Sequence, residues 1–150
     1  MTHQIDRASE LRRHIYDRTL TTGSPPTVAQ LAAVAGLDQA EVRDGLQRLA
    51  AGRIVVQQPA SGELLMVPPF SAVPTPFLVT TKRHTSYANC AWDALGVAVM
   101  MGMSARVQTA CACCGDAMSL DVHPDRPSAG GEVVHFAVPA ARWWHDVVFT

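Results

Sequence analysis

The chain has 150 residues, of which 48% are hydrophobic and 17% are charged, and its formal net charge at pH 7 is −1. This apolar content is enough for one ordinary domain or for two small packed units. The near-neutral charge excludes a global positive field that would attract nucleic acid. The N-terminus is polar, and the longest apolar run, residues 94–103, is far shorter than the roughly 20 residues that a membrane span requires. We therefore expect a cytoplasmic protein with no membrane contact.

The first 69 residues predict three helices and a hairpin. Apolar residues recur at helical spacing in three segments, 8–19, 28–35 and 39–51. Two strand-like segments follow on either side of a turn, 54–56 and 64–67. This order of elements is typical of a winged helix-turn-helix. We therefore expect residues 1–69 to form a winged-helix-like N-terminal module.

The charges of this module argue against DNA binding. Residues 1–70 contain seven Arg, no Lys and seven Asp plus Glu, whereas phosphate contacts require an excess of cations. The third helix, which would be the recognition helix, carries Asp38, Glu41 and Asp44 in its first half. We therefore favour a structural role for the module over contact with DNA.

The second half of the chain, residues 70–150, predicts a small α+β domain. A Pro-rich connection leads into a strand at residues 77–80, and a helix is expected around Cys90. Four further segments have strand-like patterns, residues 105–109, 118–122, 133–138 and 147–149. One helix packed on a small, mostly antiparallel sheet is the simplest fold for this pattern.

Residues 87–93, Tyr-Ala-Asn-Cys-Ala-Trp-Asp, place a thiol and a carboxylate three positions apart in the first turns of the expected helix. Cys90 and Asp93 then share one face of that helix. A soft sulfur nucleophile beside an oxygen acid suits the binding of a soft metal and the delivery of a proton to a group attached to it. The alternative is that Cys90 is a small buried hydrophobe and that Asp93 faces solvent.

The surroundings of Cys90 predict a reactive thiol. We expect Thr85 or Ser86 to cap the helix, which would place Cys90 near the positive end of the helix dipole. Three nearby residues, Lys82, Arg83 and His84, add positive charge. Both effects favour the thiolate, so we expect Cys90 to react first with a soft electrophile.

A second group of thiols, Cys111, Cys113 and Cys114, follows a predicted strand. Because the chain shows no export signal, we expect these residues to be reduced thiols. Their clustering indicates a metal or redox role. Zinc requires four ligands, and no second Cys-x-x-Cys or paired His is present, so copper(I) or mercury(II) fits better. Cys111 could instead be a core residue under the helix, whereas Cys113 or Cys114 could supply a second thiol to Cys90.

Several long motifs resemble the bacterial organomercurial lyases, also called alkylmercury lyases. The matching segments are residues 70–77, 87–96, 135–139 and 143–150, and a matching N-terminal domain extends the resemblance over nearly the whole chain. In that family two cysteines hold the mercury of an organomercurial, and an aspartate three residues after the first cysteine protonates the departing carbon. The resemblance implies that Cys90 is the first cysteine and Asp93 the proton donor.

The resemblance also implies the reaction and its partners. The reaction is protonolysis of a carbon–mercury bond, which makes the chain a carbon–mercury lyase that acts on organomercurial small molecules. It needs no cofactor, since mercury(II) is bound only as part of the substrate and as the product, and thiols or a mercuric reductase accept the ion. The implied mercury ligands are Cys90 and Asp93. Cys113 and Cys114 are candidates for the second thiol that the family uses.

The second catalytic cysteine of the family has no counterpart here. In the family it follows directly after a strand similar to residues 147–150, and this chain stops at Thr150. An end at Thr150, inside an apolar strand, either favours a non-catalytic protein or means that the chain is a fragment. We expect binding of organomercurials with slow cleavage unless Cys113 or Cys114 approaches Cys90. The competing interpretation is a non-catalytic soft-metal binder or a metal-responsive regulator that uses Cys90 and the 111–114 cluster.

Overall fold

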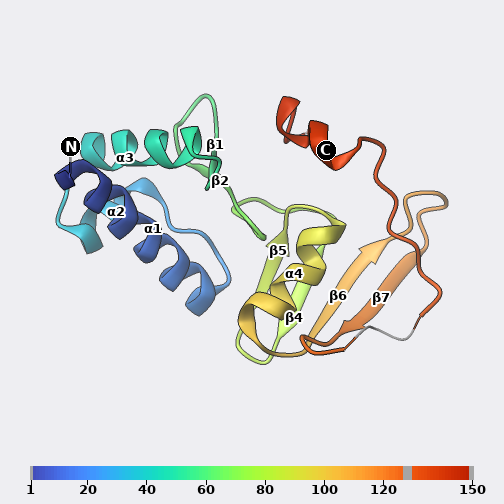
Figure 1. The fold of residues 1–150 in the computed structure, drawn as a ribbon. Coiled ribbons are helices and arrows are strands. Elements are labelled where there is room, and N and C mark those ends of the chain that lie inside the picture. The colour runs from blue at the N-terminus through green and yellow to red at the C-terminus, as the bar shows by residue number, and fades with distance from the viewer. Residues whose placement is uncertain (1, 127–129, 149–150) are drawn as a thin grey trace.

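The computed structural model describes residues 2–126 and 130–148, with side chains from residue 7 onward. Its helices are α1 (Thr2–Thr22), α2 (Val28–Ala35), α3 (Gln39–Ala51), α4 (Ala91–Met101) and the short 3-10 helix η1 (Ala140–His145). Its strands are β1 (Val56–Gln57), β2 (Leu64–Val67), β3 (Phe70–Ser71), β4 (Leu78–Thr81), β5 (Thr85–Ala88), β6 (Ala105–Ala110) and β7 (Ala117–Val122). Figure 1 shows α1, α2 and α3 to one side of α4 and strands β4 to β7.

Within the described residues, seven strands form one sheet in the order β1-β2-β3-β5-β4-β6-β7. Every strand pairing in this sheet is antiparallel. The predicted α+β class, with a helix packed on a mostly antiparallel sheet, is confirmed. Short connections join β1 to β2, β2 to β3, β4 to β5 and β6 to β7, whereas the connection from β5 to β6 contains α4.

The N-terminal helices begin where their sequence signals place them. Thr27 and Gln30 form a reciprocal capping box at α2, and Asp38 and Glu41 form another at α3. The helices and the β1–β2 hairpin enclose a first core of ten buried side chains, Leu11, Ile15, Val28, Leu31, Val42, Leu46, Leu49, Val55, Leu64 and Val67. Burial of this apolar surface is what holds the three helices together.

A second core lies between α4 and the larger part of the sheet. Its buried members are Phe70, Val79, Ala88, Ala94, Val97, Ala98, Ala105, Val107 and Val122. The first core ends at Val67 and the second begins at Phe70, and we propose a module boundary between residues 69 and 70 on this basis. The sheet itself continues across that boundary, because β2 pairs with β3.

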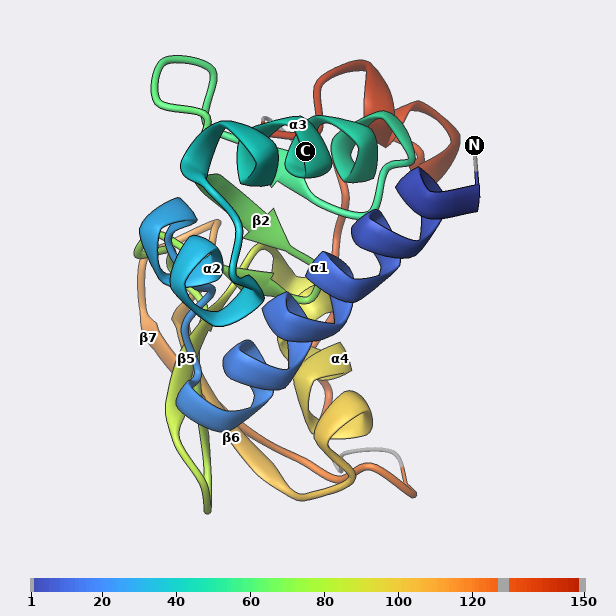
Figure 2. The same ribbon diagram turned by 90° about the vertical axis from the view of Figure 1, so that its left-hand side faces the viewer.

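Helix α1 contacts both halves of the protein (Figure 2). The Tyr16 hydroxyl donates a hydrogen bond of 3.0 Å to the carbonyl oxygen of Pro68 at the boundary. One turn further on, the carbonyl oxygen of Leu20 lies 3.1 Å from Nε2 of His84, and the Leu20 side chain packs against the second core. These contacts fix the position of the N-terminal helices relative to α4.

Three expectations about secondary structure are wrong. Thr85 and Ser86 do not cap a helix, because they belong to β5, which pairs with β3 on one side and β4 on the other. Residues 133–138 do not form a strand, and Val133 is 87% exposed, so its apolar neighbours are not the buried face of a sheet. Residues 147 and 148 lie in a turn, and residue 149 lies outside the described residues.

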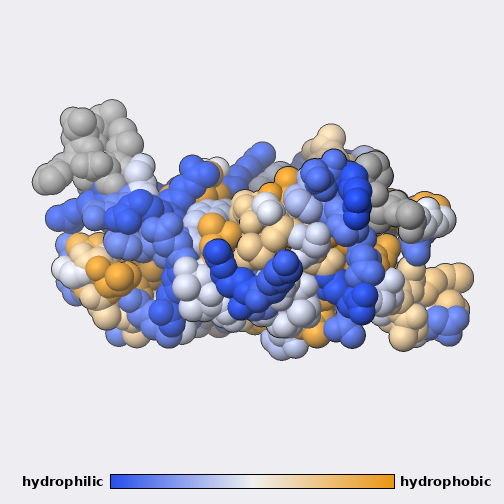
Figure 3. Space-filling model, turned by 90° about the horizontal axis from the view of Figure 1, so that it is seen from below, coloured by the Kyte–Doolittle hydropathy of each residue, from blue (hydrophilic) through white to orange (hydrophobic). Residues whose placement is uncertain are grey.

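Instead of adding strands, the segment after β7 returns along the sheet and brings η1 above the N-terminal end of α4 (Figure 1). The surface seen from below mixes hydrophilic and hydrophobic residues and shows no single continuous apolar area (Figure 3). Among the described residues, no helix combines the length and the apolar character that crossing a membrane requires.

Candidate active site around Cys90 and Asp93

Cys90 lies at the junction between β5 and α4. Its backbone is extended, with φ −151° and ψ −179°, and α4 begins at the next residue, Ala91. The Cys90 sulfur accepts a hydrogen bond of 3.5 Å from the backbone N–H of Asp93, so the cysteine itself is the N-cap. Oxygen side chains are the usual N-caps, and a thiol here leaves a polarisable nucleophile at the positive end of the helix.

Asp93 lies in the first turn of α4 and is half-buried. Its Oδ2 accepts a hydrogen bond of 2.9 Å from Nδ2 of Asn89. Burial raises the pKa of Asp93, and the hydrogen bond from Asn89 lowers it in part. The carboxylic acid form of Asp93 therefore persists to higher pH than that of an ordinary aspartate, as a proton donor requires.

The expectation that the surroundings of Cys90 favour the thiolate is wrong. Burial raises the pKa of the Cys90 thiol, and the Asp93 carboxylate raises it further, although the backbone N–H groups of Asp93 and Trp92 lower it. The cations expected to help, residues 82–84, lie in the β4–β5 turn, at the opposite end of β5 from Cys90. Strand β5, which the sequence did not reveal, is what separates them.

Cys90 and Asp93 line the same cavity, which has a volume of about 170 Å³. Its wall also includes Val56, Met66, Pro68, Asn89, Trp92, Phe136, Trp143, Trp144, Val147 and Val148. Most of these side chains are apolar, so the cavity suits an organic group placed beside the thiol. The shared location confirms that the thiol and the carboxyl lie on one face of α4.

The aromatic part of this wall is held by its own contacts. The rings of Phe136 and Trp143 lie 4.9 Å apart, and the Trp143 indole N–H donates a hydrogen bond of 2.8 Å to the Val138 carbonyl. The guanidinium of Arg53 lies over the Trp144 ring, with its Cζ atom 5.4 Å from the ring centroid. Arg53 follows α3, so this contact joins the C-terminal segment to the N-terminal module.

Sequence reasoning missed two residues near the acid. Asn89 precedes Asp93 by four positions, and that spacing is the signal that would have indicated their hydrogen bond. Tyr16 comes from α1, far away in the sequence. Burial raises the pKa of Tyr16, Arg12 lowers it and Asp93 raises it, which places the phenol close enough to Asp93 to sense its charge. No local pattern could have revealed that proximity.

The other three cysteines lie at the turn that joins β6 to β7. The Cys111 N–H bonds to the Asp116 carbonyl at 2.8 Å, and the Gly115 N–H bonds to the Cys111 carbonyl at 2.8 Å. Gly115 has φ +78°, a conformation that glycine adopts without strain. Cys111 is half-buried, so the expectation of a core residue is wrong for it, and Cys113 and Cys114 are exposed.

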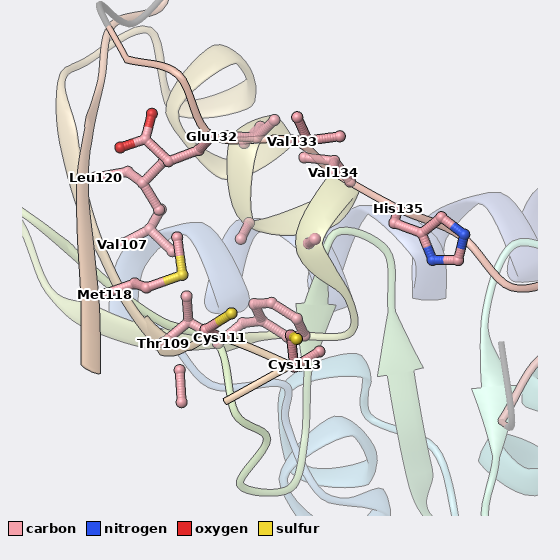
Figure 4. Close-up of a pocket in the computed structure, with 16 residues that line it drawn as sticks. Val107, Thr109, Cys111, Cys113, Met118, Leu120, Glu132, Val133, Val134 and His135 are labelled. Carbon is pink, nitrogen blue, oxygen red and sulfur yellow. The ribbon is translucent and has the colours of Figure 1, made fainter. Parts of the chain in front are cut away.

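Cys111 and Cys113 line a different cavity, of about 620 Å³, on the other side of the first turns of α4 (Figure 4). Their sulfurs and that of Met118 lie on one side of it, and residues 132–135 lie across from them. Neither Cys113 nor Cys114 is part of the wall around Cys90. Within the described residues, no three or more His, Cys, Asp or Glu side chains are arranged to hold one metal ion.

Comparison with known proteins identifies the family. The family model described as alkylmercury lyase matches residues 70–150. The chain belongs to the alkylmercury lyase family. Alkylmercury lyases of Bacillus cereus and Clostridium butyricum are each 30% identical to it over 106 residues, which are 71% of this chain and 46% of theirs. The chain thus spans about half the length of the curated relatives that it matches.

A solved structure, the mercury-bound form of MerB2, has the same fold. It superimposes with a TM-score of 0.61 at 18% sequence identity, and the match covers 81% of this chain and 59% of that one. The resemblance stated from the motifs is therefore confirmed at the level of family and fold.

The order in which the thiols react tests the pKa shifts of the cysteines. We expect limiting iodoacetamide at neutral pH to modify the 111–114 cluster before Cys90. The pKa of Cys111 is lowered by hydrogen bonds to its sulfur from the backbone N–H groups of Cys114 and Cys113 and from the Cys114 thiol, whereas that of Cys90 is raised. Peptide mass spectrometry measures the order, and preferential labelling of Cys90 would contradict it.

The raised pKa of Asp93 also predicts how stability depends on pH. The pKa of Asp93 is higher in the folded protein than in the unfolded chain, so folding disfavours the carboxylate. The free energy of unfolding therefore decreases as pH rises from below the unfolded-state pKa to above the folded-state pKa. We expect Asp93→Asn to have a higher free energy of unfolding than the original chain at neutral pH. In acid, where Asp93 is protonated, the two free energies should be similar. Urea unfolding at both pH values measures it. The exposed Asp125→Asn is the control and should show no such difference; equal effects of the two variants would argue against burial as the cause.

Proposed function

We propose that this chain binds organomercurials through Cys90 and cleaves their carbon–mercury bond with a proton from Asp93. One observation supports this most strongly. A half-buried carboxyl, whose acid form is favoured, lies in the same apolar cavity as a thiol three residues away. A soft ligand for mercury, a proton donor for carbon and a pocket for the organic group thus occur together.

The first step forms a sulfur–mercury bond. The Cys90 thiol loses its proton to solvent, and the thiolate displaces the exchangeable ligand of the organomercurial, which leaves with its electron pair. Because burial and Asp93 raise the pKa of Cys90, this step should become faster as pH rises. The nearby Trp92, Phe136 and Trp143 offer apolar surface to the organic group.

The second step breaks the carbon–mercury bond. The electron pair of that bond takes the proton of the Asp93 carboxylic acid and becomes a carbon–hydrogen bond, so a hydrocarbon leaves. Mercury(II) remains on sulfur, and Asp93 becomes a carboxylate. The hydrogen bond from Asn89 then stabilises the carboxylate and holds it beside the metal.

A second thiolate on mercury would increase the electron density at the bonded carbon and make its protonation easier. Val147 and Val148, which resemble the family segment before the second cysteine, lie in the wall of the Cys90 cavity. A cysteine added directly after this segment is therefore a candidate to bring a second thiol to the site. Use of Cys113 or Cys114 would require the β6–β7 turn to approach Cys90.

The same proposal covers the cofactor requirement, the acceptor of the mercuric ion and the location of the protein. No cofactor is needed, because Cys90 and Asp93 provide both the nucleophile and the acid. Thiols or a mercuric reductase would accept the mercuric ion, and a cytoplasmic location would supply both. This sequence of events amounts to detoxification of organic mercury.

Hydrocarbon release from a simple organomercurial tests the proposal. We expect Cys90→Ser to abolish release, and Asp93→Asn to lower it by about 10²-fold or more while mercury still binds, because only the proton donor is lost. A form extended by one cysteine after Thr150 should be faster than the chain itself. Asp125→Asn is the control that should keep the original rate. Equal rates for the chain and Asp93→Asn would remove the acid from the mechanism, and absence of binding by every form would refute the lyase assignment.

We also propose that residues 1–69 are a winged-helix-like module with a structural role. Val56 and Met66 of its hairpin form part of the Cys90 cavity, and Tyr16 of α1 lies near Asp93. Three of its arginines form ion pairs, Arg7 with Glu41 at 3.2 Å, Arg13 with Asp17 at 3.5 Å and Arg48 with Asp44 at 2.6 Å. The module thus completes the cavity and presents few cations that are free to contact phosphate.

A titration against random duplex DNA at low salt tests this role. We expect no binding at micromolar protein, because few counterions would be released. Fluorescence anisotropy of a labelled duplex is the measurement. Micromolar affinity with a steep dependence on salt concentration would instead support the metal-responsive regulator.

A further inference from the structure

The cavity on the other side of the first turns of α4 has no part in the proposed reaction. Its volume is about 620 Å³, compared with about 170 Å³ for the cavity around Cys90. An apolar cavity of about 150 Å³ already holds one benzene molecule, and binding sites for small organic molecules commonly have volumes of about 300 to 1,000 Å³. The larger cavity therefore has room for a small organic molecule.

Most of the wall of this larger cavity is apolar. Helix α4 contributes Ala91, Ala94 and Leu95, and strands β6 and β7 contribute Val107 and Leu120. The small side chains of the two alanines leave space that longer side chains would occupy. An apolar group that enters this space is removed from water, and that transfer is the main source of affinity for such a group.

The charges of the wall disfavour an anionic ligand. No Lys or Arg is among the described residues that line the cavity, and Glu132 contributes a carboxylate. Glu132 and His135 lie across the cavity from the sulfurs of the β6–β7 turn (Figure 4). We therefore expect a ligand that is apolar over most of its surface and is either neutral or cationic.

The sulfur atoms of the wall indicate what else the ligand carries. Those of Cys111, Cys113 and Met118 lie on one side of the cavity, and sulfur prefers soft metals (Figure 4). Cys113 is exposed and Cys111 is half-buried, so Cys113 is the more accessible thiol. Within the described residues no three or more His, Cys, Asp or Glu side chains are arranged to hold a bare metal ion. A mercury atom that is already bonded to carbon needs only one thiolate for a linear pair of ligands, so an organomercurial fits this wall better.

We propose that the larger cavity binds an organomercurial, with its mercury bonded to Cys113 and its organic group in the apolar space. Binding replaces the sulfur–hydrogen bond of Cys113 with a sulfur–mercury bond and releases the proton to solvent. The exchangeable ligand of the organomercurial leaves with its electron pair. The choice of an organomercurial over other apolar compounds that react with thiols rests on the proposed function. The compound is held on the opposite side of α4 from Cys90, beside the proposed active site.

Competition with glutathione tests this site, with phenylmercuric acetate and methylmercuric chloride as the two probes. All forms carry Cys90→Ser, so the thiol of the proposed active site is absent. Relative to glutathione, we expect the Cys90→Ser chain to bind the phenyl compound at least about 10-fold more strongly than the methyl compound, because only the ring fills apolar space. Native mass spectrometry measures the occupancy, and peptide mapping locates the mercury.

Three variants of the Cys90→Ser chain decide whether the cavity causes this preference. Cys113→Ser should remove it. Cys114→Ser is the matched control, since it removes an adjacent exposed thiol that does not line the cavity, and it should keep the preference. Val134→Asn places a polar group in the apolar wall at a position that is 44% exposed, so it should weaken binding of the phenyl compound and leave that of the methyl compound unchanged.

Equal binding of the two probes by the Cys90→Ser chain would overturn the proposal. So would a preference for the phenyl compound that survives either Cys113→Ser or Val134→Asn. Binding is measured without Cys90 and requires no cleavage of a carbon–mercury bond, so failure of the lyase reaction would leave this result unaffected. Circular dichroism of each variant shows whether the fold is kept.

Discussion

The hydrogen bond from the Asp93 N–H to the Cys90 sulfur is the contact on which the site depends. It starts α4 at a thiol, and one helical turn then places the carboxyl of Asp93 beside that thiol. The same junction buries both groups, so that burial raises both pKa values. One local geometry thus raises the pKa of the carboxyl and that of the thiol beside it.

Much of the fold could be predicted from local signals. The capping boxes at Thr27 and Asp38 and the spacing of apolar residues gave α2 and α3 their correct bounds, and alternation indicated β6 and β7. Strand β5 was missed because Thr85 and Ser86 are also good capping residues, and only pairing with β3 and β4 decides between the two roles. The apolar residues at 133–138 resembled a strand, yet no strand pairs with them in the described part of the chain.

The site was predictable only where it is local in sequence. Cys90 and Asp93 could be paired because they lie three positions apart at the start of a helix, and the motifs around them identified the family. The raised pKa of Cys90 could not be predicted, because it follows from burial, and the residues that line the cavity with Cys90 include Phe136 and Trp143, about 50 positions away. The separation of Cys113 from Cys90 likewise depends on which side of α4 the β6–β7 turn faces.

The continuous sheet has a consequence for how this protein can be divided. Because β2 pairs with β3, removal of residues 1–69 would turn β3 into an exposed edge and would open the wall that Val56 and Met66 provide. The family segment from residue 70 onward is therefore not an independently portable unit in this chain. Recombination or grafting that exchanged the N-terminal part would have to preserve the edge of a sheet and one side of a pocket at the same time.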